Sequence, residues 1–253
     1  MASTLESPAP LQHHGDDTGI LLVHGFSGSP ASFAPLIPRL IAQGWTVHTI
    51  WLAGHGTSEE DLATKTSSDW VLSLRAGIDR LRRQTQRIIV IGDSFGGNLA
   101  LYAALMGPPI AGVVTLGTPV SARHDLMNRA LLPILTRIQP YHRKSWVKDP
   151  AAQRAAGSYL RIPLRAYAEV IRFIDRHTKR ELEGVRVPLF VVQAKKDYEV
   201  HPSSAYFLSE HAGSTHKALL WVDERIHHVL LSKEADRIID RIIGFVQAIA
   251  KQA

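Results

Sequence analysis

A serine, Ser94, lies in the segment GDSFG at positions 92–96, which has the form G-x-S-x-G. The apolar stretch RIIVI precedes this segment, and the stretch GNLALYAAL follows it. Between a strand and a helix, the pattern is typical of a sharp turn whose glycines are required because the two elements pass too close for a Cβ atom. Such a turn projects the serine hydroxyl above the sheet, where it can act as a nucleophile.

A serine nucleophile requires a base, and the base requires an acid that orients it. On alternating strands and helices, these partners are expected in the order serine, acid, histidine, in loops that follow later strands. Asp197 follows the strand-like run LFVVQA and is the favoured acid. Glu199 in the same loop and Asp223 after the next strand-like run are the alternatives.

Two adjacent histidines, His227 and His228, are the candidates for the base. They follow the strand-like run ALLWV after a short loop. Neighbouring residues in a loop point in different directions, so only one of them can face Ser94. The other is expected to pack or to form hydrogen bonds, and the order of residues alone does not separate the two.

Backbone N–H groups that would stabilise the oxyanion are expected in the segment VHGFSGSP, residues 23–30, after the first apolar strand. The N–H of Phe26 is one predicted donor, and the N–H of Phe95, directly after the serine, is the other. The substrate pocket is predicted to include His24, Gly25, Trp51, Asp93 and His227.

Alternating strands and helices must position these residues. The runs at 19–25, 45–52, 87–92, 110–119, 187–197 and 216–223 are apolar without polar alternation, which is typical of strands buried on both faces of a parallel sheet. Helical patterns lie between them, and an amphipathic helix closes the chain at about 233–249. We predict an α/β protein with a mostly parallel central sheet and helices on both faces.

One basic segment interrupts this pattern. Residues 121–186 hold fourteen Lys and Arg against six Asp and Glu, although the whole chain of 253 residues has a net charge of only +6. Apolar clusters within the segment predict a helical insertion at the carboxyl edge of the sheet, where open α/β sheets bind ligands. We therefore divide the chain into a flexible arm (1–18), a core (19–118 and 187–253) and a helical cap or lid (119–186).

Composition excludes several classes of protein. No cysteine is present, so disulfides and thiolate chemistry are impossible. No apolar stretch reaches about 18 residues, so no membrane span is predicted. The first residues lack the pattern of a secretory signal, so we expect a cytoplasmic protein. The histidines show no metal-ligand spacing, so no metal and no organic cofactor is expected. The basic residues are scattered rather than clustered, which disfavours nucleic acid as a partner. A monomer or homodimer is expected.

These residues resemble the α/β-hydrolase superfamily, and within it the bacterial carboxylesterase and monoacylglycerol-lipase-like group. The resemblance covers about residues 20–246 through the motifs LLVHGFSGSP, LAGHG, GDSFGG, GVVTLGTP, VPLFVVQAKKD and HHVL. It implies the α/β-hydrolase fold with a helical cap, Ser94 as nucleophile and Asp197 as acid. It also implies Phe26 and Phe95 as the donors of the oxyanion hole.

The resemblance also selects one of the two histidines. The catalytic histidine of this group usually lies in S-G-H-V, which matches residues 226–229 and places it at His228, with His227 at the position of the glycine. Asp93, before the serine, is a departure from the group, which commonly has His, Leu or Tyr there. Its carboxylate either adds negative charge beside the triad or binds donors of the nearby loops.

The function implied is hydrolysis of a small-molecule carboxylic ester through an acyl-enzyme on Ser94. The implied substrates are short- to medium-chain acyl esters or monoacylglycerols. The same triad serves acyl transfer and thioester hydrolysis, so both remain alternatives. Two further alternatives are an enzyme that cleaves amide or carbon–carbon bonds and a ligand-binding protein without catalytic activity.

Overall fold

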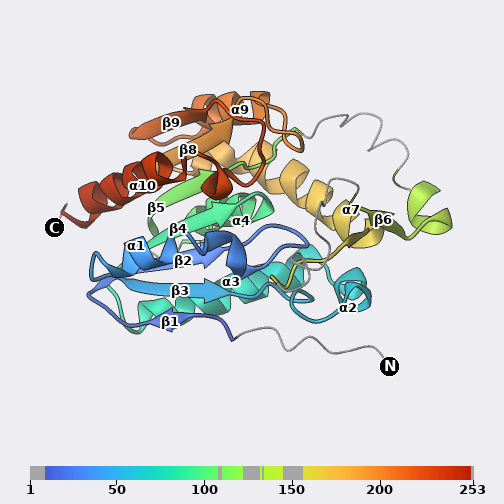
Figure 1. The fold of residues 1–253 in the computed structure, drawn as a ribbon, viewed down its shortest axis with the longest axis horizontal. Coiled ribbons are helices and arrows are strands. Elements are labelled where there is room, and N and C mark those ends of the chain that lie inside the picture. Colours follow the sequence, from blue (N-terminus) through green and yellow to red (C-terminus); the bar gives the residue numbers. More distant parts are fainter. Residues whose placement is uncertain (1–8, 108–109, 122–131, 133, 145–155, 252–253) are drawn as a thin grey trace.

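A seven-stranded sheet forms the centre of the protein (Figure 1). The computed structural model describes residues 9–107, 110–121, 132, 134–144 and 156–251. The strands lie in the order β1-β3-β2-β4-β5-β8-β9, and all neighbours are parallel except β1 and β3. Their bounds are β1 Gln12–His13, β2 Thr18–Val23, β3 Thr46–Ile50, β4 Arg87–Asp93, β5 Ile110–Leu116, β8 Leu189–Ala194 and β9 Lys217–Val222.

Helices cover both faces of the sheet, and its inner strands are therefore buried on both sides. Every residue of β2, β3 and β8 is buried. One apolar layer joins the sheet to α3 (Ser67–Arg82), α4 (Phe95–Leu105) and α9 (Ser203–His211). The other joins it to α1 (Ile37–Ile41) and α10 (Ala235–Ala250). The predicted α/β architecture is confirmed.

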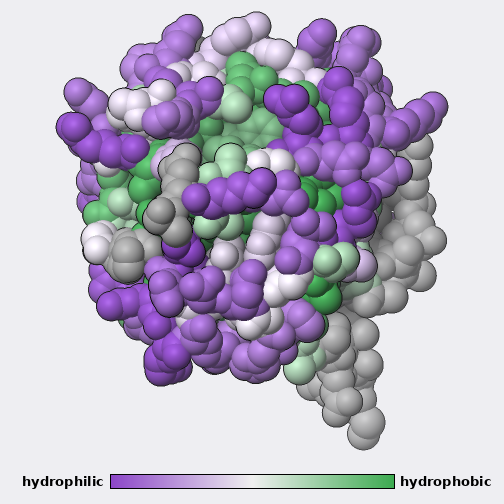
Figure 2. All heavy atoms as spheres, turned by 90° about the vertical axis from the view of Figure 1, so that its left-hand side faces the viewer, coloured by the Kyte–Doolittle hydropathy of each residue, from purple (hydrophilic) through white to green (hydrophobic). Residues whose placement is uncertain are grey.

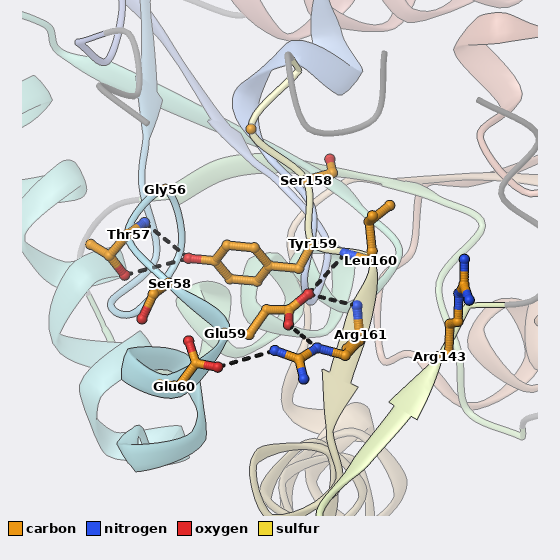
Figure 3. A pocket seen from close by; sticks show the side chains of 11 residues that line it. Gly56, Thr57, Ser58, Glu59, Glu60, Arg143, Ser158, Tyr159, Leu160 and Arg161 are labelled. Atoms are coloured by element: carbon orange, nitrogen blue, oxygen red, sulfur yellow. Dashed lines mark hydrogen bonds and ion pairs between the residues drawn. The ribbon is translucent and has the colours of Figure 1, made fainter. Parts of the chain in front are cut away.

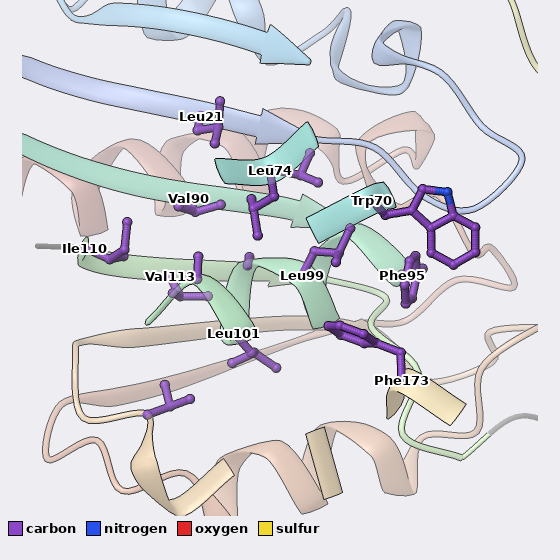
Figure 4. Packing of buried hydrophobic residues seen from close by; sticks show 14 of the residues in the cluster. Leu21, Trp70, Leu74, Val90, Phe95, Leu99, Leu101, Ile110, Val113 and Phe173 are labelled. Carbon is purple, nitrogen blue, oxygen red and sulfur yellow. The ribbon is translucent and has the colours of Figure 1, made fainter. Parts of the chain in front are cut away.

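Aromatic rings fill the first layer near the carboxyl ends of the strands (Figure 4). The ring of Trp70, on α3, lies edge-on to that of Phe95 at 5.3 Å between centroids. Phe95 in turn contacts Phe173 at 5.5 Å. Such edge-to-face pairs contribute about 0.5–1.5 kcal/mol beyond their buried area. The start of α4, which follows the candidate serine, is therefore held by packing from two sides.

The segment between β5 and β8 is not helical throughout. It contains a separate antiparallel pair, β6 (Tyr141–Arg143) and β7 (Arg161–Pro163), before helix α7. Residues 122–131, 133 and 145–155 of the predicted helical insertion, 119–186, lie outside the described residues. The elements not yet named are α2 Glu59–Thr64, α7 Leu164–Phe173, α8 Lys179–Glu181, the π turn η2 Ile174–Thr178 and the 3₁₀ turns η1 Pro30–Phe33, η3 Leu182–Gly184 and η4 Val229–Leu231.

Part of the predicted arm, residues 1–18, contacts the sheet. The N–H of Leu11 donates to the Thr49 hydroxyl at 2.8 Å, and the N–H of Thr49 donates to the Leu11 carbonyl at 3.0 Å. Gln12 and His13 form β1 against β3. Residues 1–8 lie outside the described part. An edge strand of two polar residues carries no apolar pattern, so the sequence did not reveal it.

Polar side chains dominate the end of the molecule opposite α7. Figure 2 looks at this end, and hydrophilic residues surround the hydrophobic ones that reach its surface. Within the described residues, no helix is both long and apolar enough to cross a membrane.

Candidate active site

Ser94 occupies a strained turn between β4 and α4. Its φ of 51° and ψ of −122° lie where non-glycine residues are rare. A Cβ on Gly92 would lie 2.2 Å from the Gly96 carbonyl oxygen, and one on Gly96 would lie 2.0 Å from that of Val23. Both glycines are therefore steric requirements. They allow β4 to turn directly into α4, which leaves Ser94 half-buried at the strand end.

We expect Gly96→Ala to destabilise the fold by about 3 kcal/mol, the upper end of the usual cost of overpacking. The clash is with backbone carbonyls, which cannot rotate away as a side chain can. Urea unfolding followed by circular dichroism measures the loss. Gly244→Ala is the matched control, because a Cβ there meets nothing within 4 Å and the site lies within α10. That variant should gain about 0.5–1 kcal/mol. Equal stability of the two variants would contradict the steric argument.

The histidine that contacts Asp197 is His227. Nδ1 of His227 lies 2.9 Å and 3.2 Å from the two carboxylate oxygens of Asp197, and both side chains are buried. Asp197 also accepts hydrogen bonds from the N–H groups of Glu199 and Val200 and from the Gln193 amide. These donors fix the carboxylate, which in turn fixes the imidazole.

The expected contact between Asp197 and His228 is therefore wrong. His228 turns away and places its Nδ1 3.1 Å from Oδ2 of Asp93. Its side chain is 39% exposed, whereas that of His227 is 1% exposed. Because adjacent residues diverge, one histidine contacts each carboxylate. Asp93 is the sequence feature that could have predicted this arrangement, since a carboxylate before the serine provides a partner for the second histidine.

The two alternative acids occupy different places. Asp223 is exposed and pairs with Lys196 at 3.1 Å. Glu199 lies on the far side of the His227 ring, where its Oε2 is 3.7 Å from Nε2. Asp197 is thus the carboxylate on the Nδ1 side of the imidazole, which is where an orienting acid acts.

The loop after β2 presents Phe26 next to a second strained residue, Ser27, with φ of 55°. The N–H of Ser27 donates to Nε2 of His55 at 2.8 Å, and the Ser27 carbonyl accepts from the N–H of Tyr159 at 3.0 Å. Burial lowers the pKa of His55 well below its usual value, so its ring stays neutral and can accept this bond. Both peptide groups of Ser27, and with them the Phe26 turn, are held in place.

Phe95 is the first residue of α4. The first N–H groups of a helix have no acceptor within the helix and lie at its positive end. Its N–H therefore suits the second donor position.

Two predicted pocket residues lie elsewhere. His24 is fully buried and accepts from the N–H of Leu52 at 3.2 Å through Nε2. The Trp51 ring packs edge-on against the His24 ring at 5.5 Å between centroids. A Cβ on Gly157 would lie 2.9 Å from the Trp51 ring. Neither side chain is among the described residues that line the cavity at Ser94. Instead the two rings pack against each other, next to the ends of β2 and β3.

A cavity of about 490 Å³ brings the remaining site residues together. Ser94, His227 and His228 line it, as do Phe26 and Phe95. The predicted pocket residues Gly25 and Asp93 line it too, while apolar lining comes from Ile162, Tyr167, Val170, Val200 and Leu231. Within the described residues, no group of three or more His, Asp or Glu side chains is placed to hold a metal ion.

Carboxylates dominate the electrostatics around His227. Burial alone would lower its pKa, but Glu199, Asp197 and Asp93 outweigh burial and raise the pKa to about 10. Burial would likewise raise the pKa of Asp93, yet the two neighbouring histidines hold it below its usual value. The arrangement therefore favours an ionised Asp93 and positive charge on His227.

Lys144 is a cavity residue that the sequence did not indicate. It follows β6, and its Nζ lies 3.4 Å from the Ser27 carbonyl oxygen. Burial lowers the pKa of Lys144 to about 8, against the opposing effect of Glu199 and Glu59. Only the return of the inserted segment to the core brings it here, because it lies fifty residues from Ser94 along the chain.

A second hollow marks where the inserted segment meets the core (Figure 3). The Tyr159 hydroxyl donates to the Gly54 carbonyl at 2.8 Å and accepts from the N–H of Thr57 at 2.9 Å. Arg161 pairs with Glu59 and also with Glu60. Polar contacts thus hold residues 159–161 against the loop before α2 and the first turn of α2.

Comparison with known proteins identifies the family of this chain. The sequence model of the family described as serine aminopeptidase, S33, matches residues 16–234, and the chain belongs to this family of hydrolases. The thermostable monoacylglycerol lipase of Bacillus sp. (strain H-257) is 31% identical over 244 residues, which is 95% of both chains. The Bacillus subtilis (strain 168) carboxylesterase is 25% identical over 95% of this chain and 97% of its own.

Solved structures show the same fold. One reported for metagenome-derived lipolytic enzymes matches with a TM-score of 0.84 and 27% identity, over 94% of this chain and 97% of its own. The monoacylglycerol lipase of Paleococcus ferrophilus matches with a TM-score of 0.80 and 18% identity, over 95% and 98%. The resemblance to α/β-hydrolases of the carboxylesterase and monoacylglycerol-lipase-like group is confirmed.

Proposed function

We propose that this protein is a serine carboxylesterase that hydrolyses small carboxylic esters through an acyl-enzyme on Ser94. Ester hydrolysis is the activity that its full-length relatives, a monoacylglycerol lipase and a carboxylesterase, support. One observation carries the assignment of residues. The strained Ser94 and His227 line one cavity, and the buried Asp197 holds the His227 ring from behind it.

In this mechanism Ser94 attacks the ester carbonyl and His227 Nε2 takes its proton. Asp197 holds Nδ1 and stabilises the charged ring. The N–H groups of Phe26 and Phe95 stabilise the oxyanion. His227 then protonates the leaving alcohol. Water, deprotonated by the same nitrogen, releases the acid and restores Ser94. His227 thus replaces His228 as the proposed base.

The cavity supports short- to medium-chain acyl esters or monoacylglycerols as substrates. Its volume of about 490 Å³ lies toward the lower end of usual ligand pockets, about 300–1,000 Å³. Ile162 and Val170, from the inserted segment, supply apolar lining suited to an acyl chain. We propose that residues 119–186 act as a cap over this cavity, in a cytoplasmic monomer or homodimer.

A p-nitrophenyl ester series from acetate to laurate tests this function, together with glycerol release from a monoacylglycerol. We expect hydrolysis with a maximum at short or medium chains, because the cavity has a volume of only about 490 Å³ and part of its lining is apolar. An aminoacyl p-nitroanilide is the comparison substrate, since the family description refers to aminopeptidases. The proposal is wrong if no ester is hydrolysed. Cleavage of the anilide would then indicate an aminopeptidase, cleavage of a thioester a thioesterase, and product formed only with an added alcohol an acyltransferase.

A further inference from the structure

A carboxylate faces the nitrogen of His227 that is proposed to move protons. Glu199 Oε2 lies 3.7 Å from Nε2, and the Glu199 side chain is 32% exposed where it lines the cavity. The distance exceeds that of a hydrogen bond, so the contact is electrostatic and leaves Nε2 available to Ser94.

The loop after β8 is built so that this carboxylate reaches Nε2. The N–H groups of Glu199 and Val200 donate to Oδ1 of Asp197 at 2.8 Å and 3.0 Å. Val200 is also buried, which anchors the loop. The backbone of Glu199 therefore fixes the acid on one side of the ring, while its side chain extends to the other. Replacing the carboxylate leaves these backbone bonds in place.

Other ionisable groups surround the ring but occupy different positions. Asp197 holds Nδ1, and Asp93 acts from the end of β4. The His228 ring lies 5.0 Å away, and the Tyr198 ring lies 6.2 Å away with a pKa that burial raises to about 12. Lys144, from the inserted segment, interacts with Glu199 rather than with His227.

We propose that Glu199 is a positioning residue that acts through His227, by stabilising positive charge at Nε2 of the imidazole. The inference rests on the proposed function of His227. The proton that reaches Nε2 comes from Ser94 Oγ and leaves on the alcohol oxygen, so the charged ring is the form present during both transfers. Glu199 stabilises that form, and the neutral ring needed at the start is reached at higher pH.

The test compares the pH dependence of kcat/KM for wild type, Glu199→Gln and Glu199→Asp. Because the neutral imidazole accepts the proton, activity rises as pH passes through the pKa of the free enzyme's base. Glu199→Gln should move this rise to lower pH by about one unit, the low end of the effect of a charge within about 4–6 Å. Glu199→Asp should keep part of the original profile.

Glu210→Gln is the control, because it removes an equal charge from an exposed site on α9. Its profile should match that of wild type. If the profile of Glu199→Gln also matches wild type, or shifts no further than that of Glu210→Gln, the inference is wrong. A merely structural role would lower activity at every pH without moving the profile.

An NMR titration separates this inference from the proposed function. The His227 ring signal, assigned by its loss in His227→Ala, is followed against pH with and without Glu199→Gln. A lower pKa in Glu199→Gln supports the inference even if esters are not hydrolysed, in which case only the proposed function fails. An unchanged pKa in an active esterase rejects the inference alone.

Discussion

Ser94→Ala is expected to lower kcat for ester hydrolysis by about 10⁶-fold, because no other side chain replaces the attacking oxygen. Removing the serine or the histidine of a triad costs about as much as removing all three members, since they act as a unit. The remaining rate would come from binding and from the proposed N–H donors of Phe26 and Phe95. KM should change little, because the hydroxyl adds little to ground-state binding.

The measurement is steady-state hydrolysis of the best p-nitrophenyl ester by purified variants. Ser209→Ala is the matched control, since Ser209 lies on α9 and is not among the cavity residues of the described structure. Both variants should show wild-type circular dichroism. Retention of more than about one-hundredth of the activity in Ser94→Ala would show that the nucleophile is another residue.

His227→Ala and His228→Ala should differ by several orders of magnitude although the residues are adjacent. His227→Ala should lower kcat by about 10⁶-fold, because it removes both the base and the partner of Asp197. His228→Ala should cost less than about tenfold, because its Nδ1 contacts Asp93 and it has no place in the proton transfers.

Each of the two variants is the control for the other, because both replace a histidine by alanine at adjacent positions. Measuring kcat at several pH values shows whether a variant has lost activity or has only shifted its pH–activity profile. A larger loss in His228→Ala would assign the base to His228, as the S-G-H-V motif implies, and would reject the pairing seen in the structure.

The sequence predicted the parts of this fold that depend on strong local rules. The strands could be found because they are buried on both faces and have no polar alternation. The turn at Ser94 could be found because only glycine fits at positions 92 and 96. The order of Asp197 and the two histidines followed from the connection of the strands.

Other features depend on the course of the backbone in three dimensions. Which histidine meets Asp197 is decided by the direction of the loop before η4, and no local pattern encodes that direction. Lys144 reaches the cavity only because β6 and β7 return the inserted segment to the core. His24 and Trp51 were predicted to line the pocket, but their rings pack against each other and do not line the cavity at Ser94.

The hydrogen bonds of the Ser27 peptide groups join the core and the inserted segment at the turn that carries Phe26, the proposed oxyanion donor. His55 from the core holds one side of this turn, and Tyr159 from the inserted segment holds the other. Withdrawal of residues 156–163 from the cavity would remove the second of these bonds. Under the proposed mechanism, the turn that carries the Phe26 N–H would then keep fewer restraints. A substrate in an open cleft would meet a less ordered donor, which would limit premature attack before the ester is shielded from bulk water.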